Sequence, residues 1–189
     1  MKYKIGVYGS AAGDYTTFIP LAEKIGLALG EHAGSVIVIT GACPGLPYAA
    51  AKIAAGKGVE VWGFSSSLDE TAQRQEYKDD DLSIYKKVVY VPADFPFADN
   101  ERACKKYRNV ISTANCDAAI IISGRWGSLN EFTNLIDMHK TVGLLTGTGG
   151  VADEIAALPR KISKPGQGEI LFDNDPQTLV EKILLTLRS

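Results

Sequence analysis

Short apolar runs alternate with stretches of helical periodicity along the whole chain, and this alternation limits the folds that it can adopt. Residues 118–122, for example, read Ala-Ala-Ile-Ile-Ile, a continuous apolar run typical of a parallel strand that is covered on both faces. Strands separated by helices favour a parallel sheet, because each parallel connection has to cross that sheet. The pattern therefore predicts an α/β fold, a doubly wound parallel sheet of about seven strands with helices on both faces.

The predicted elements follow from periodicity and from the positions of glycine and proline. We expect strands near residues 4–9, 36–40, 59–65, 87–92, 118–122, 142–146 and 169–172. We expect helices near residues 15–30, 46–56, 99–115, 128–139, 150–158 and 176–188. The length of 189 residues favours one domain over residues 1–189.

One segment departs from this compact alternation. Residues 65–87 are rich in charge and include three consecutive aspartates, Asp79 to Asp81. A charged run of this kind is typical of a solvated surface excursion, and the alternative is a flap over a bound ligand. The prolines and glycines of residues 161–168 predict a turn before the last strand.

The composition argues against several classes of binding partner. The formal net charge is −2, so the chain has no general attraction for nucleic acid or for anionic membranes. Its three cysteines show no C-x-x-C spacing, and neither His32 nor His139 has a second metal ligand at useful spacing, so we expect no metal site. We also expect a reducing, cytoplasmic location, because the chain opens on a strand-like run and not on a secretory signal.

A glycine-rich turn after the fifth predicted strand carries the strongest functional pattern. Residues 123–131 read Ser-Gly-Arg-Trp-Gly-Ser-Leu-Asn-Glu and lead into a helix that we expect to begin near Ser128. The first N–H groups of a helix have no partner within it, and the helix dipole attracts an anion there. Gly124 and Gly127 let a ligand approach without a Cβ in the way. The turn therefore predicts a phosphate site.

Two more loops of small residues follow predicted strands. They are residues 9–13 and 40–45, with Gly9, Ser10, Gly41 and Gly45 as candidate ligand contacts. In open parallel sheets, ligands bind outside the carboxyl ends of the strands, where the winding direction reverses. We therefore expect one nucleotide-sized cleft. The G-x-G-x-x-G and G-x-x-x-x-G-K-[ST] motifs are absent, which argues against a nicotinamide dehydrogenase and a P-loop kinase.

Structural roles compete with these functional ones. Ser128 and Glu131 have the spacing of a capping box, in which each side chain bonds the other residue's backbone N–H. Arg108 lies in a charged helical stretch and is open to interpretation as a solvated surface residue. Residues 148–150, Thr-Gly-Gly, fit a second anion site or an ordinary loop.

The same residues resemble the Lonely guy (LOG) family and its relatives in the SLOG superfamily of Rossmann-like nucleotide-binding proteins. The likeness covers most of the chain and rests on three segments. They are residues 6–10, residues 40–45, and Arg108-Asn109 ahead of residues 123–131. The branch that it resembles most contains molybdenum cofactor carrier proteins and members labelled as lysine decarboxylases.

This resemblance implies residue roles. LOG enzymes hydrolyse the bond between base and ribose in a nucleoside 5'-monophosphate and carry the pattern P-G-G-x-G-T-x-x-E after an upstream arginine. The resemblance implies that Glu131 is catalytic and that Arg108 clamps the phosphate or the ribose. The implied ligand contacts are Gly9, Ser10, Gly41, Gly45, Ser123, Gly124, Arg125, Trp126, Gly127 and Ser128.

Departures from the pattern leave two functions open. Ser123 replaces the proline, Arg125 the second glycine and Ser128 the threonine. The first function is that of a nucleoside 5'-monophosphate phosphoribohydrolase, and the alternative is a non-catalytic carrier or sensor of a nucleotide or pterin. The expected ligand is a nucleoside monophosphate or a pterin-type nucleotide, with no required cofactor. The family also implies a homodimer or a larger homo-oligomer.

Overall fold

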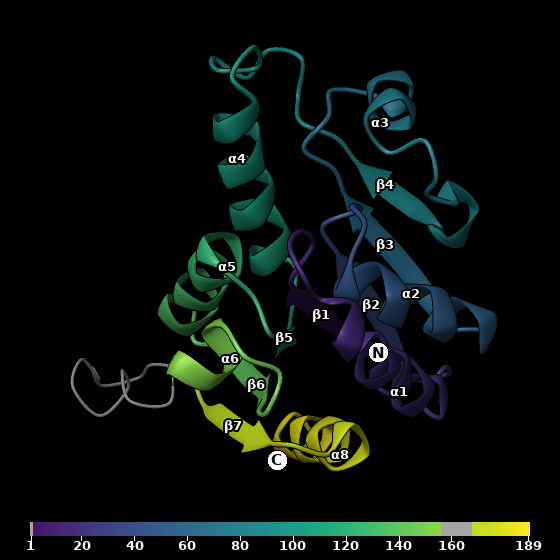
Figure 1. The fold of residues 1–189 in the computed structure, drawn as a ribbon, viewed down its shortest axis with the longest axis vertical. Helices are drawn as coiled ribbons and strands as arrows, with labels where there is room; N and C mark the ends of the chain where they lie inside the picture. The colour runs from purple at the N-terminus through teal and green to yellow at the C-terminus, as the bar shows by residue number, and fades with distance from the viewer. Residues whose placement is uncertain (1, 156–167) are drawn as a thin grey trace.

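The computed structural model describes residues 2–155 and 168–189. Seven parallel strands form one sheet in the order β4-β3-β2-β1-β5-β6-β7 (Figure 1). The strands are β1 (Tyr3–Gly9), β2 (Val36–Thr40), β3 (Glu60–Phe64), β4 (Lys87–Val89), β5 (Ala118–Ile122), β6 (Thr141–Leu145) and β7 (Ile170–Asp173). The predicted α/β, Rossmann-like, doubly wound fold is confirmed.

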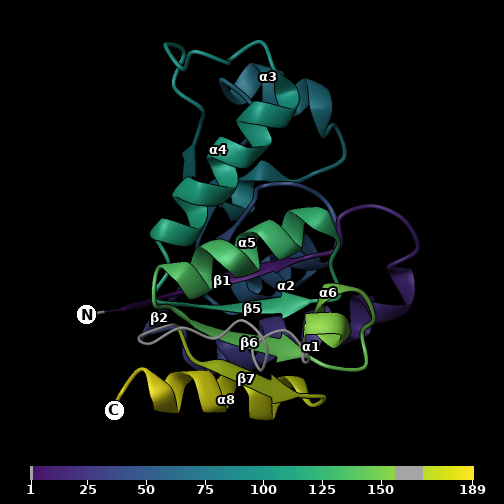
Figure 2. The ribbon, with the colours of Figure 1, turned by 90° about the vertical axis from the view of Figure 1, so that its left-hand side faces the viewer.

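Helices cover both faces of the sheet (Figures 1 and 2). The helices of one face are α1 (Ile19–Gly30), α2 (Leu46–Gly56) and α8 (Pro176–Thr186). Those of the other face are α4 (Glu101–Ala114), α5 (Trp126–Asp137) and α6 (Val151–Glu154). Between β3 and β4 the chain forms α3 (Glu70–Glu76) and the short 3-10 turn η2 (Leu82–Ile84), and a second such turn, η1 (Thr16–Phe18), precedes α1.

Alternation along β1 divides the core into two layers. Ile5 and Val7 pack against α1 and α2, whereas Tyr8 joins the layer beneath α5. Central strands β2, β5 and β6 are buried at every position, as expected for strands covered on both faces. The apolar runs read from the sequence therefore correspond to the centre of the sheet.

Three predicted features differ from the structure. The helix expected from residue 128 begins at Trp126, because the chain turns helical directly after Arg125. The segment 65–87 contains α3 and η2 and is not only a solvated excursion. The last strand-like residues of 87–92 lie outside the three-residue β4. The part of the predicted helix 150–158 from residue 156 onward, and residues 161–167 of the predicted turn, lie outside the described residues.

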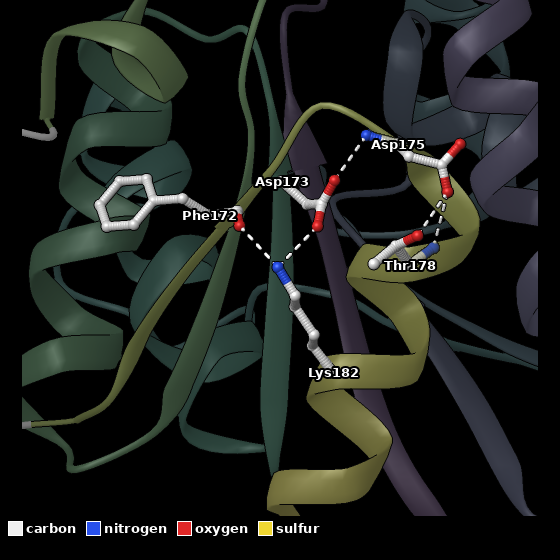
Figure 3. Close-up of polar contacts among 5 residues, drawn as sticks. All are labelled: Phe172, Asp173, Asp175, Thr178 and Lys182. Carbon is white, nitrogen blue, oxygen red and sulfur yellow. Dashed lines mark hydrogen bonds and ion pairs between the residues drawn. The ribbon is translucent and has the colours of Figure 1, made fainter.

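Polar contacts connect the edge strand β7 to α8, which follows it in the chain (Figure 3). Lys182 on α8 donates to a carboxylate oxygen of Asp173 at 2.6 Å and to the carbonyl oxygen of Phe172 at 3.2 Å. Asp175 caps α8 by accepting from the backbone N–H of Thr178 at 2.8 Å. These contacts fix β7 and α8 relative to each other at a distance from the sheet centre.

Winding reverses between β1 and β5, and the pair leaves no room for a side chain at the carboxyl end of β1. Gly9 pairs with Ile122, and a Cβ added to Gly9 would lie 2.2 Å from the Ile122 carbonyl oxygen. Only glycine fits at this position without moving one of the strands. The crevice at which ligands bind in such sheets therefore opens directly above Gly9.

We expect the substitution Gly9→Ala to lower the free energy of unfolding by about 1–3 kcal/mol, because the new methyl group meets backbone that has no room to move. Urea denaturation followed by circular dichroism measures the change. Gly34→Ala is the matched control, since an added Cβ there meets nothing within 4 Å. Equal stability of the two variants would contradict the close approach of β1 and β5.

Candidate nucleotide-binding site

A cavity of about 410 Å³ lies above the carboxyl ends of the central strands. Its walls come from the loops after β1 and β2, the end of α3, one face of α4 and the start of α5. Its charged lining residues are Lys105, Arg108, Arg125, Glu76 and Glu131. A cavity of this size accommodates a small ligand, and the excess of cations favours an anionic one.

The turn before α5 is held by hydrogen bonds to two neighbouring loops. The Ser10 hydroxyl accepts from the backbone N–H of Gly124 at 3.0 Å and donates to the Ser123 hydroxyl at 3.1 Å. The backbone N–H of Ser123 donates to the Thr148 hydroxyl at 2.8 Å. Ser10 thus joins the first loop to the turn across the point where the winding reverses.

Backbone geometry at this turn differs from the family pattern. Ser123 has a φ of 56°, a value that the ring of the proline in that pattern does not allow. Gly124 has a φ of 104°, and a Cβ there would lie 2.5 Å from the Cβ of Ser128. The turn therefore requires glycine at position 124 and excludes proline at position 123.

The start of α5 presents its first N–H groups without a side-chain cap. Arg125 occupies the N-cap position in an extended conformation and makes no capping hydrogen bond. Ser128 is then the third residue of the helix and not its cap, so the capping-box interpretation of Ser128 and Glu131 is wrong. Gly127 and Ser128 both line the cavity, so the helix start faces it.

Glu131 lies one turn further along α5, with only 7% of its surface exposed. Among the described residues, no donor forms a hydrogen bond with its carboxylate. Burial raises the pKa of Glu131 to about 7, although the charges of Arg108 and Lys106 act in the opposite direction. A carboxyl with a pKa near neutrality is suited to proton transfer or to stabilising a developing positive charge.

Arg108, on α4, lines the cavity and is not a solvated surface residue. Its guanidinium donates to the Gly41 carbonyl oxygen through Nη1 and to Asn109 Oδ1 through Nε, the latter at 2.9 Å. Cys43 Sγ lies 3.9 Å from the same Nη1. Arg108 is thus held against the loop after β2 while it contributes charge to the cavity.

The structure brings most of the predicted site residues together. Those that line the cavity are Gly9, Ser10, Gly41, Arg108, Arg125, Gly127, Ser128 and Glu131. Gly45, Ser123 and Gly124 belong to the same loops but are not among the residues that line the cavity. Trp126 is 82% exposed and does not line the cavity, because the first residue of α5 points to solvent.

Several lining residues lie outside the glycine-rich loops that mark the candidate site in the sequence. Tyr8 lies on the face of β1 opposite Ile5 and Val7, and strand alternation was the available signal. Asn109 is adjacent to Arg108 on α4, and Glu76 and Tyr77 come from the charged segment. Cys43, in the loop of residues 40–45, also lines the cavity.

The Thr-Gly-Gly loop at residues 148–150 does not form a second anion site. Asp153 accepts from the backbone N–H groups of Gly147 and Gly149, each at 2.7 Å. These N–H groups are therefore occupied.

Within the described residues, no cluster of three His, Cys, Asp or Glu side chains is placed to hold a metal ion, and no helix is long and apolar enough to cross a membrane.

The family model described as the SLOG cluster4 family matches residues 2–180. Solved structures similar to this chain include the molybdenum cofactor binding protein from Rippkaea orientalis, with 17% identity, a TM-score of 0.72, and coverage of 99% of this chain and 98% of that one. The molybdenum cofactor carrier protein from Chlamydomonas reinhardtii has 17% identity and a TM-score of 0.70, with both chains fully covered.

A third similar structure is DNA processing protein A from Helicobacter pylori, described with a single-stranded DNA binding mode. It has 16% identity and a TM-score of 0.67, and covers 97% of this chain and 81% of that one. No curated protein sequence matches the chain. At these identities the structural likeness establishes the fold, while the family match confirms the resemblance inferred from residues 6–10, 40–45 and 123–131.

Burial of Glu131 predicts a dependence of stability on pH. Its pKa is about 7 in the folded protein and about 4.5 when unfolded, so the folded state holds an extra proton between these values. Stability is therefore lost as pH rises from about 4.5 to 7. We expect the free energy of unfolding of Glu131→Gln to exceed that of the wild type by about 3 kcal/mol at pH 8 and to match it near pH 4.5.

Urea denaturation at the two pH values measures this difference. Glu23→Gln, at an exposed position on α1, is the control and should leave the pH dependence unchanged. If the free energies of unfolding of Glu131→Gln and the wild type differ by the same amount at both pH values, the Glu131 carboxyl is not shielded from water.

Proposed function

Because this chain belongs to the SLOG cluster4 family, we propose that its cavity binds a nucleotide or a nucleotide-like cofactor through a phosphate group placed at the start of α5. One observation carries this proposal. The uncapped first turn of α5, the cation of Arg125 and the buried carboxyl of Glu131 face the same cavity. Phosphate is the anionic group that helix starts of this kind commonly hold.

Hydrolysis of the N-glycosidic bond is the reaction that this arrangement supports best. Cleavage of the bond between base and ribose builds positive charge on the sugar, and a carboxylate nearby stabilises that charge and orients the attacking water. Glu131 supplies the carboxylate. Arg108 holds the phosphate or the ribose with the donors that its contacts to Gly41 and Asn109 leave free. The products are a free base and ribose 5-phosphate.

A carrier or sensor that binds without chemistry is the second candidate. Arg125 occupies the position of a glycine in the LOG pattern and lines the cavity, where its long side chain takes space that a reacting substrate needs. Two of the similar structures are described as binding or carrying molybdenum cofactor. A pterin-type nucleotide is therefore the ligand of this second candidate.

We further propose that the protein acts in the cytoplasm as a single-domain homodimer or larger homo-oligomer. Cys43, Cys104 and Cys116 are free thiols, which suits a reducing compartment. Exposed apolar side chains on the helices, among them Leu27 and Val110, offer surface for self-association. The net charge of −2 argues against nucleic acid as the ligand.

Phosphate recognition predicts that GMP binds at least about tenfold more tightly than guanosine, because the nucleoside lacks the group that the helix start and Arg125 receive. Isothermal titration calorimetry measures both. Arg125→Ala should weaken GMP binding by about tenfold, whereas the exposed Arg102→Ala on α4, outside the cavity, should not. Equal affinity for nucleoside and nucleotide would refute phosphate binding.

If the protein is an enzyme, it should release free base from nucleoside 5'-monophosphates. Chromatography measures this release. Glu131→Gln should slow this release by roughly 100-fold or more. The rate for the wild type should rise as pH increases through about 7, because the charge-stabilising form of Glu131 is the carboxylate. Tight binding with no release at any pH would instead support the carrier.

A further inference from the structure

Glu76, the last residue of α3, and Tyr77 line the cavity from the segment that follows β3. The strand order β3-β2-β1-β5 places the loops after β3 and β5 three strand spacings apart, about 14 Å at the usual separation. Figure 1 shows α3 near β3 and β4, and α5 on the β5 side of β1. This span suits a mononucleotide whose phosphate lies at α5 and whose base lies at α3.

A buried polar contact fixes α3 to the rest of the cavity. Gln73 is fully buried, and its Nε2 donates to the Ala42 carbonyl oxygen at 2.9 Å. Ala42 itself belongs to the loop after β2 and has a φ of 46°, a strained value for a residue with a Cβ. The position of Glu76 is thus set by the same loop that contacts Arg108.

The carboxylate of Glu76 is oriented by a neighbouring hydroxyl. Ser67, which is buried, donates to Glu76 Oε2 at 3.4 Å. Burial, assisted by hydrogen bonding to Glu76, raises the pKa of Tyr77, so its phenol remains a neutral donor with an apolar ring. A carboxylate accepts up to four hydrogen bonds, so Glu76, which lines the cavity, keeps acceptor capacity beyond its contacts with Ser67 and Tyr77.

A carboxylate at this place selects among bases by their donors. It pairs best with two adjacent N–H groups in one plane, as it does with the donor fork of arginine. A ring N–H beside an exocyclic amino group, the 2-amino-4-oxo edge of guanine and of pterins, has this arrangement. Hypoxanthine keeps the ring N–H but lacks the amino group, and adenine presents an acceptor nitrogen in place of the ring N–H.

We propose that Glu76 and Tyr77 form a base-recognition subsite for a 2-amino-4-oxo ring edge, so that the ligand is a guanine nucleotide or a phosphorylated pterin. The proposal rests on the function proposed above, since it assumes that the phosphate lies at α5. Glu76 accepts the two N–H groups, and the half-buried ring of Tyr77 offers a face on which the base stacks.

Calorimetry with GMP, IMP, AMP and neopterin monophosphate tests this subsite. GMP and IMP differ only in the exocyclic amino group, so wild-type protein should bind GMP on the order of tenfold more tightly than IMP. The ratio of affinities for GMP and neopterin monophosphate identifies which of the two ring systems is preferred. Tighter binding of either one than of IMP and AMP supports the subsite.

Glu76→Gln should bring the GMP affinity to within about twofold of the IMP affinity, since an amide offers one acceptor oxygen and a competing donor. Glu70→Gln is the matched control on the same helix, because Glu70 is exposed and outside the cavity. Thermal unfolding verifies that both variants fold.

Three results would overturn the subsite. Equal affinities of the wild type for GMP, neopterin monophosphate, IMP and AMP would refute base recognition while leaving the phosphate site intact. A preference for GMP over IMP that persists in Glu76→Gln would assign recognition to another residue. Failure of every phosphorylated ligand to bind would refute the subsite together with the proposed function.

Discussion

The close approach of β1 and β5 is the constraint on which the site depends. Gly9 allows the two strands to touch at their carboxyl ends, and Ser10 then joins the loop after β1 to the turn before α5 through its hydroxyl. Because the winding reverses between these strands, their connections leave toward opposite faces of the sheet. The crevice that remains is bordered by the start of α5.

Electrostatics then divides this crevice into regions with different preferences. Arg125 and the start of α5 provide a positive end, whereas Glu76 provides a negative one. Between them, Arg108 and Glu131 interact electrostatically in a buried setting, where burial raises the pKa of Glu131 to about 7. A ligand with an anionic group at one end and N–H donors at the other satisfies both ends at once, which reconciles the proposed phosphate site with a net charge of −2.

Local sequence patterns predicted the sheet but not every wall of the cavity. Apolar runs such as residues 118–122 identify central strands because both of their faces are buried. The start of α5 was placed two residues late, because Ser128 resembles an N-cap and nothing in the sequence reveals that Arg125 adopts the cap position. Helix α3 escaped prediction, since it is short and charged and is anchored by Gln73, a polar side chain that no hydrophobic periodicity marks. Trp126 lies in the motif yet points to solvent. A motif sets the spacing of residues along the chain, whereas the helix sets the direction in which each side chain points.

The claim that an anion is received at the start of α5 is tested most directly by nuclear magnetic resonance of the backbone amides. Titration of ¹⁵N-labelled protein with GMP should shift the N–H resonances of Gly127 and Ser128 strongly and saturably, because phosphate oxygens accept hydrogen bonds from the first turn of the helix. Inorganic phosphate should shift the same resonances in the same direction at higher concentration. Resonances of residues 126–128 that stay in place while GMP saturates another part of the molecule would contradict the claim.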